Sequence, residues 1–163
     1  TRRSSDLNNI AAKTIKAING FVGSLTGNVT GNLTGNVTGN VTGNLTGNVV
    51  GGMQPPVTAV TADGAIAVPA VFRTYFVTKA GVAAMTIVDP TATTHDGISL
   101  TFISTTAQAH TLSNAAGSGF FSSGGASKDV ATFGGAIGDG LTIVAYQGKW
   151  YIDPRGTTGI TLG

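Results

Sequence analysis

The chain has 163 residues, and only 10% of them are charged, well below the roughly 25% of a typical soluble domain. It contains no cysteine, which excludes disulfides and thiolate metal sites as the basis of its fold. The formal net charge of +2 is too small to indicate nucleic-acid binding. No apolar run reaches the roughly 18 residues of a membrane span, so we expect neither nucleic acid nor membrane as a partner. So few charges suit a protein that buries much of its surface in an assembly.

Residues 1–20 have the pattern of a short amphipathic helix. Ser4, Ser5 and Asp6 supply a capping hydroxyl and an acid for the first turn, and Asn19–Gly20 supplies a stop. Apolar side chains recur at helical spacing: Leu7, Ile10, Ala11, Ile15 and Ile18. Because so short a helix is marginal alone in water, it either packs on its own domain or docks on a partner. The alternative we favour is an anchor on an acidic partner surface, through Arg2, Arg3, Leu7, Ile10, Ile15 and Ile18.

Residues 21–52 form an array with a period of four. The tetrapeptide Leu/Val-Thr-Gly-Asn recurs six times from Leu25 to Asn48 without error. This period does not match the 3.6 residues of a helical turn, and Val, Thr, Asn and Gly are poor helix formers. In an extended chain the aliphatic and glycine residues lie on one face and Thr and Asn on the other. A lone strand cannot bury the apolar face, so we expect three copies to wind around a shared axis lined by Leu25, Val29, Leu33, Val37, Val41, Leu45 and Val49.

Two other interpretations of the array stay open. Its Gly-rich, polar composition is also found in flexible linkers, although linkers rarely keep an aliphatic residue at every fourth position. The Asn-Val-Thr and Asn-Leu-Thr triplets match the N-glycosylation acceptor, but the repeat unit generates them automatically. They therefore carry almost no information about glycosylation.

Residues 53–56, Met-Gln-Pro-Pro, break the pattern and predict a hinge before a β-rich knob of residues 57–163. Turn signals occur at Asp63–Gly64, Asp96–Gly97 and Asp139–Gly140, and Gln147–Gly148 predicts a tight turn. Strands rich in β-branched, aromatic or alternating residues are predicted at 71–79, 83–88, 98–102, 141–147 and 149–152. The Gly/Ser-rich stretch 115–127 is predicted to be a surface loop. This spacing indicates a compact β-sandwich or barrel-like knob.

The knob contains few motifs typical of a catalytic or metal-binding site. His95–Asp96 places a base beside a carboxylate, but it lies in a turn, and His110 has no acid or serine motif near it. The glycine-rich run 134–140 lacks the Lys-Ser/Thr of a phosphate-binding loop. We expect no catalytic residue, no metal site and no cofactor. Phe120 and Phe121 are candidate exposed contacts for a partner, with folding back onto the core as the alternative.

The order of helix, fibrous repeat and β-knob resembles the trimeric fibres and spikes of tailed bacteriophages. The Thr-Gly-Asn-Val/Leu array is similar to repeats in phage fibre shafts, and residues 75–81, 104–111 and 144–150 are similar to segments of phage structural proteins. The resemblance covers most of residues 21–163. It implies a mainly β fold with a short N-terminal helix, an intertwined trimeric β-repeat shaft and a C-terminal β-sandwich or barrel-like knob, and it carries no catalytic motif.

These patterns and the resemblance imply two functions of different class. The first is a virion structural protein, a short homotrimeric fibre or spike whose N-terminus attaches it to other virion proteins of the head, neck or tail. The second is a receptor- or glycan-binding adhesin whose knob contacts the host surface. An enzyme such as a depolymerase is the weakest alternative, because no carboxylate pair stands out. We expect the protein to reside on the virion.

Overall fold

A computed structural model describes residues 54–114 and 118–163 of the chain. They belong to one structural unit, Val49–Gly163, and the fold below is the fold of that unit. The predicted helix at 1–20 and the predicted shaft at 21–52 lie outside the described residues. Gln54, Pro55 and Pro56, the described part of the predicted hinge, have no regular secondary structure.

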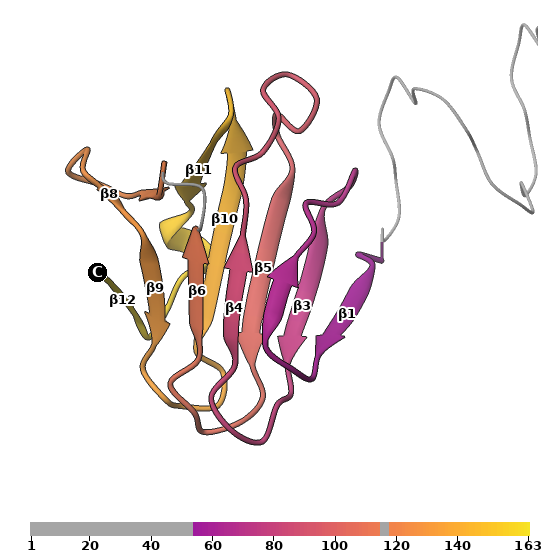
Figure 1. Ribbon diagram of the computed structural model, residues 1–163, viewed down its shortest axis with the longest axis vertical. Coiled ribbons are helices and arrows are strands. Elements are labelled where there is room, and N and C mark those ends of the chain that lie inside the picture. Colours follow the sequence, from indigo (N-terminus) through magenta and orange to yellow (C-terminus); the bar gives the residue numbers. More distant parts are fainter. Residues whose placement is uncertain (1–53, 115–117) are drawn as a thin grey trace, which may run out of the picture. The chain divides into compact units, whose positions relative to one another are not determined.

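The unit is built from short strands in two sheets (Figure 1). The strands are β1 (Val57–Val60), β2 (Gly64–Ile66), β3 (Arg73–Val77), β4 (Ala84–Ile87), β5 (Ser99–Ser104), β6 (Thr111–Asn114), β7 (Phe120–Phe121), β8 (Ser127–Lys128), β9 (Val130–Phe133), β10 (Gly140–Tyr146), β11 (Lys149–Ile152) and β12 (Ile160–Leu162). A single 3-10 turn among the described residues, η2 (Pro154–Gly156), separates β11 from β12. The seven-stranded sheet has the order β1-β3-β5-β10-β11-β7-β8, and the five-stranded sheet has the order β12-β9-β6-β4-β2.

The first six strands form a coil. Odd-numbered strands enter the seven-stranded sheet and even-numbered strands enter the five-stranded sheet, so the chain changes sheet after every strand. Each of β1 to β4 consequently pairs in parallel with the strand two places later, as in β1 with β3 and β4 with β6. Parallel neighbours need a crossover, which is most often a helix. Here the crossover is a strand of the opposite sheet. The strands are short and are separated by turns, so the chain can cross to the other sheet after each one.

The later strands close this coil mainly by antiparallel pairing. β10 lies between β5 and β11 and pairs antiparallel with both, and β9 does the same between β6 and β12. The link between β10 and β11 is the Gln147–Gly148 turn. Both residues have positive φ, 48° and 75°, as a two-residue turn of type I′ requires. The turn predicted at this position is confirmed.

The core lies between the two sheets and follows the alternation of the strands. In β5 every second residue is buried, beginning with Leu100, and β10 buries Leu141, Ile143 and Ala145 in the same way. The largest fully buried side chain is Trp150, whose Nε1–H donates to the carbonyl oxygen of Val88 at 2.9 Å. Both sheets contribute residues to this one cluster. Burial of these apolar surfaces is the main stabilising term of the unit.

The prediction of a mainly β fold is confirmed for the described residues. Each predicted strand overlaps an observed strand with boundaries that differ by a few residues at most. The predicted surface loop at 115–127 is wrong in part, because Phe120–Phe121 forms β7 and pairs with β11. At Asp139–Gly140 the turn lies just before the predicted pair, because the Asp139 N–H donates to the carbonyl oxygen of Ala136 at 3.3 Å and Gly140 begins β10.

Candidate functional site

Aromatic side chains gather on the outer face of the seven-stranded sheet, the face turned away from the core. Phe121 of β7 and Tyr151 of β11 are direct neighbours in the sheet, and their ring centroids lie 5.5 Å apart. The ammonium group of Lys149 lies 4.9 Å from the centroid of the Phe121 ring. Tyr146, paired with Lys149, is 58% exposed. Exposed ring faces beside a cation offer both stacking and polar contacts to a ligand, and we call these four residues the aromatic cluster.

The two phenylalanines predicted as exposed contacts point in opposite directions. Phe120 is completely buried, so its prediction as an exposed partner contact is wrong. The reason is that Phe120 and Phe121 form a strand, in which successive side chains point to opposite faces. Phe121 is partly exposed on the outer face. Sequence reasoning missed Tyr146, Lys149 and Tyr151, although alternation around a core Trp150 would have placed Lys149 and Tyr151 outside.

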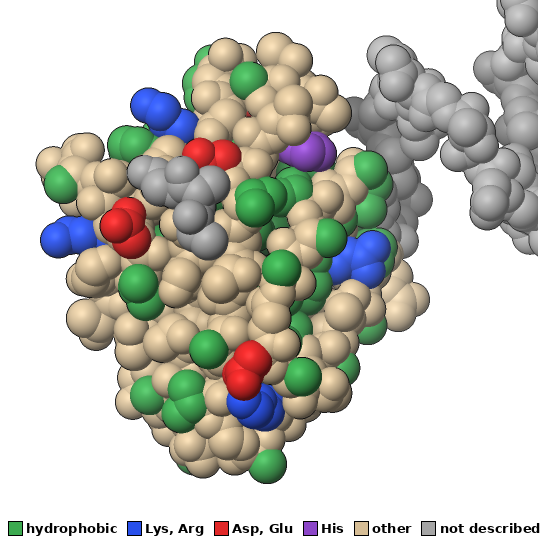
Figure 2. Space-filling view, viewed as in Figure 1, with side chains coloured by type: hydrophobic (Ala, Val, Ile, Leu, Met, Phe, Trp, Pro, Cys, Tyr) green, Lys and Arg blue, Asp and Glu red, His purple; other side chains and the backbone are tan. Residues whose placement is uncertain are grey.

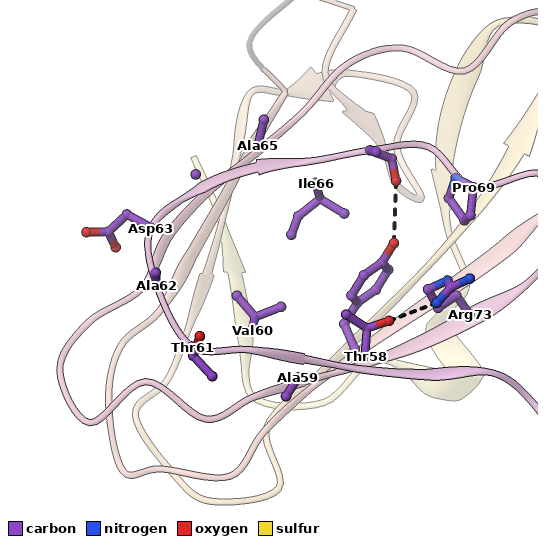
Figure 3. A pocket seen from close by; sticks show the side chains of 13 residues that line it. Thr58, Ala59, Val60, Thr61, Ala62, Asp63, Ala65, Ile66, Pro69 and Arg73 are labelled. Carbon is purple, nitrogen blue, oxygen red and sulfur yellow. Dashed lines mark hydrogen bonds between the residues drawn. The ribbon is translucent and has the colours of Figure 1, made fainter.

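A pocket of about 470 Å³ lies between β1 and β2, at the start of the coil (Figure 3). Val60 and Ile66 point into it from opposite sides, while Asp63 points away. At its far end the Tyr75 hydroxyl donates to the carbonyl oxygen of Ala67 at 3.4 Å. Burial raises the pKa of Tyr75, and the nearby Arg73 cation opposes that rise, so the hydroxyl stays a donor.

Arg73 lines the same pocket from the first residue of β3. Its Nη1 donates to Thr58 Oγ1 at 2.8 Å. Its Nε is buried and has no hydrogen-bond partner among the described residues. A buried donor without an acceptor is costly, so Arg73 Nε is placed to donate to an oxygen of water or of a bound group at the end of the pocket near Tyr75 (Figure 3). No signal in the sequence distinguished this arginine.

The histidine and aspartate singled out in the sequence serve separate parts of the structure. His95 Nδ1 accepts a hydrogen bond of 2.8 Å from the backbone N–H of Thr91. Asp96 accepts from Gln147 instead. The two side chains therefore hold the loop before β5 and the β10–β11 turn, and they do not form a catalytic pair.

His110 is buried and fully engaged. Its Nδ1 accepts from the backbone N–H of Ala83, and its Nε2 lies 2.9 Å from Thr106 Oγ1. The Thr106 hydroxyl in turn donates to the carbonyl oxygen of Lys79. Because Nδ1 is an acceptor, the imidazole is neutral with its proton on Nε2. Burial lowers the pKa of His110, and the positive charge of Lys79 lowers it further.

Charges on the unit are sparse and of both signs, and they are scattered over the face seen in Figure 2. Two ion pairs join described residues, Lys79 to Asp63 at 2.7 Å and Arg155 to Asp153 at 2.9 Å. Within residues 54–114 and 118–163, no three potential metal-ligating side chains come together. No helix in this part of the chain has the length and apolarity to cross a membrane.

The predicted anchoring residues (Arg2, Arg3, Leu7, Ile10, Ile15 and Ile18) and the predicted axis residues (Leu25 to Val49) lie outside the described residues. Among the described residues, the structure brings together two candidate sites, the aromatic cluster and the pocket between β1 and β2. Comparison with known protein families finds no match, and comparison with curated proteins finds none either. The proposal below rests on the repeat array and on the geometry of the described unit.

Proposed function

We propose that this chain is a structural protein of a tailed-bacteriophage virion and forms a short homotrimeric fibre or spike. In this arrangement residues 1–20 attach the fibre to the head, neck or tail of the particle. Residues 21–52 form the shaft, and residues 57–163 form the knob at its end. The observation that carries the proposal is the unbroken tetrapeptide array from Leu25 to Asn48, placed directly before a β unit with its own core.

Physical chemistry supports the trimer because the array has an apolar face that one chain cannot bury. Each tetrapeptide contributes one Leu or Val and one Gly to that face. Glycine lets neighbouring backbones approach closely, and Gly-Asn tolerates the positive φ of a turn. Winding three chains removes both the exposed aliphatic residues and the free strand edges.

Two measurements on the complete chain test the proposal. Sedimentation equilibrium gives the mass in solution, where we expect three times the 16.2 kDa of one chain. Gold-labelled antibodies against residues 57–163 should decorate purified particles at one class of position in electron micrographs. A folded monomer that leaves particles unlabelled would refute the proposal.

The aromatic cluster favours a second candidate function, that of an adhesin whose knob binds a host-surface glycan. Tyr146 and Tyr151 are 58% and 39% exposed, and Lys149 stands beside them. Replacing Tyr151 by Ala should reduce saturable binding of the complete chain to host cells. Thr161→Ala, an exposed change on the five-stranded sheet, is the matched control. Equal binding by both variants and the wild type would remove this candidate.

A further inference from the structure

The outer faces of the two sheets differ in the size of their apolar side chains. Strand alternation places Val57, Ala59, Phe76 and Ile103 on the outer face of β1, β3 and β5, together with the hydroxyl residues Thr74, Ser99 and Thr101. The corresponding positions of β4, β6 and β9 are Ala84, Thr86, Thr111, Ser113, Val130 and Thr132. The seven-stranded sheet therefore carries two large apolar side chains, Phe76 and Ile103, near its β1 edge, whereas these strands of the other sheet carry none larger than Val130. Large apolar side chains gathered near one edge of a sheet are candidates for a contact surface.

The apolar residues form a continuous row. Ala59 pairs with Phe76 in the sheet, and Phe76 pairs with Ile103, so the three side chains are cross-strand neighbours. Val57 lies on the same face at the β1 edge and is 61% exposed. Phe72, directly before β3, is 39% exposed. We call the row and its edge, residues Val57, Ala59, Phe76 and Ile103, the β1 face.

Further along the same sheet, the outer face is covered by the chain itself. The Thr142 hydroxyl of β10 donates to the carbonyl oxygen of Gly156 in η2 at 3.0 Å. Thr142 is consequently only 7% exposed although it points away from the core. Among the described residues the β1 face is less covered, because Val57 and Ala59 are exposed and Phe76 and Ile103 are partly exposed. The β1 face is also distinct from the aromatic cluster, which lies on the far side of β10, mainly on β11 and β7.

The position of the β1 face in the chain identifies its occupant. β1 is the first strand of the unit and the edge strand of the seven-stranded sheet. Residues 53–56 connect it to the array and span at most about 14 Å even when fully extended. If three arrays share one axis, three β1 edges are held within that reach of the axis. The high local concentration then favours contact between the knobs.

We infer that the β1 face is the surface through which the knobs of neighbouring copies of this chain contact one another. The inference rests on the proposed trimer. Val57, Ala59, Phe76 and Ile103 become buried against the next copy, and the outer face of the five-stranded sheet stays in water. The contact extends the trimer from the shaft into the knob, so the knobs do not swing independently.

Single introduced cysteines test this inference cleanly, because the natural chain has none. Ala59→Cys and Ala65→Cys are a matched pair. Both replace an exposed alanine on an edge strand, and the two side chains point away from the pocket on opposite sides (Figure 3). The rate of labelling by a small maleimide is measured on each complete chain and divided by the rate for the same variant in denaturant. We expect the Ala59→Cys thiol to react at least about tenfold more slowly than the Ala65→Cys thiol. The reason is that a thiol buried in a contact reacts only when the contact opens.

Sedimentation of the same samples separates the possible failures. Equal labelling rates in a chain that sediments as a trimer overturn the β1 contact and leave the fibre proposal standing. Slower labelling of Ala65→Cys also overturns it, because the contact then involves the other face. A monomeric chain with two fast thiols refutes the trimer and the β1 contact together.

Discussion

Both carboxylate oxygens of Asp96 accept hydrogen bonds from Gln147, a residue 51 positions further along the chain. The backbone N–H of Gln147 donates to Oδ1 at 2.7 Å, and its side-chain Nε2 donates to Oδ2 at 2.8 Å. Gln147 has a φ of 48°, a conformation that non-glycine residues seldom adopt. Asp96 thus stabilises the strained turn that joins β10 to β11.

Replacing Asp96 by Ala should lower the free energy of unfolding by about 1.5–3 kcal/mol, the range for hydrogen bonds to a charged group. Asp96→Asn keeps one acceptor oxygen for the Gln147 N–H and should cost less. Urea unfolding followed by Trp150 fluorescence measures both. If Ala and Asn cost the same, the carboxylate does not hold the turn in the way the distances indicate.

Gly159 is expected to be intolerant of any side chain. Its φ is +64°, and an added Cβ would overlap the carboxylate of the buried Asp139. Gly159→Ala should therefore combine about 1–2 kcal/mol of left-handed backbone strain with about 1–3 kcal/mol of overpacking. Gly138→Ala is the matched control, because Gly138 has a φ of +94° and no atom within 4 Å of the added Cβ. Thermal unfolding should show a clearly larger loss for Gly159→Ala, and equal losses would contradict the steric argument.

Stability should fall as the pH is lowered through the range in which histidine titrates. The folded pKa of His110 is lowered by burial and by Lys79, whereas the unfolded chain keeps a pKa near 6.5. The unfolded state therefore binds more protons between these two values, and the free energy of unfolding rises with pH across that window. The stabilisation from His110 is fully present above the pKa of the histidine in the unfolded chain. It is lost progressively as the pH falls below that value.

Urea midpoints at about pH 8 and pH 5.5, above the titration range of Asp, measure this dependence. The complete chain should be less stable at the lower pH. His110→Gln removes the titrating group and should reduce the difference between the two midpoints, while His95 remains in both proteins. An unchanged difference in the variant would assign the pH dependence to another group.

Deletion of residues 1–20 tests the proposed anchor. The truncated chain keeps the array and the knob, so it should remain a folded, soluble oligomer that no longer incorporates into particles. Copy number per virion, measured by immunoblot of purified particles, is the readout. Normal incorporation of the truncated chain would show that attachment lies elsewhere.

Charge placed in the array tests whether it has an inside and an outside. Val37→Asp with Val41→Asp puts carboxylates on the proposed axis of three chains, where burying an unpaired charge costs several kcal/mol. Thr38→Asp with Thr42→Asp puts the same charges on the opposite face and should cost far less, near the roughly 1 kcal/mol of a typical substitution. Limited proteolysis should cut the array of the first variant readily and leave its knob intact. Equal resistance of the two variants would make the array a flexible linker, and the fibre proposal would fall.

Several features of the knob followed from the sequence alone because they depend on near neighbours. Alternation in residues 98–102 and 149–152 predicted strands, since consecutive residues of a strand face opposite sides wherever the strand is placed. The Gln147–Gly148 turn was predictable for the same reason, because its requirement for positive φ is local. Absence of cysteine and scarcity of charge were likewise sufficient to exclude disulfides and to leave hydrophobic burial as the source of stability.

Only the tertiary structure decided which strands pair. Ala84 pairs with Thr111, and Thr111 also pairs with Thr132, partners whose sequences carry no mark of one another. Pairing depends on how both sheets fill the shared core, which is a property of the whole unit. The same packing decided that Phe120 points inward and Phe121 outward, that Arg73 lines a pocket, and that Asp96 reaches Gln147. Side chains that meet only across the core leave no local pattern, so the parallel coil and its apolar β1 face became visible only once the sheets were assembled.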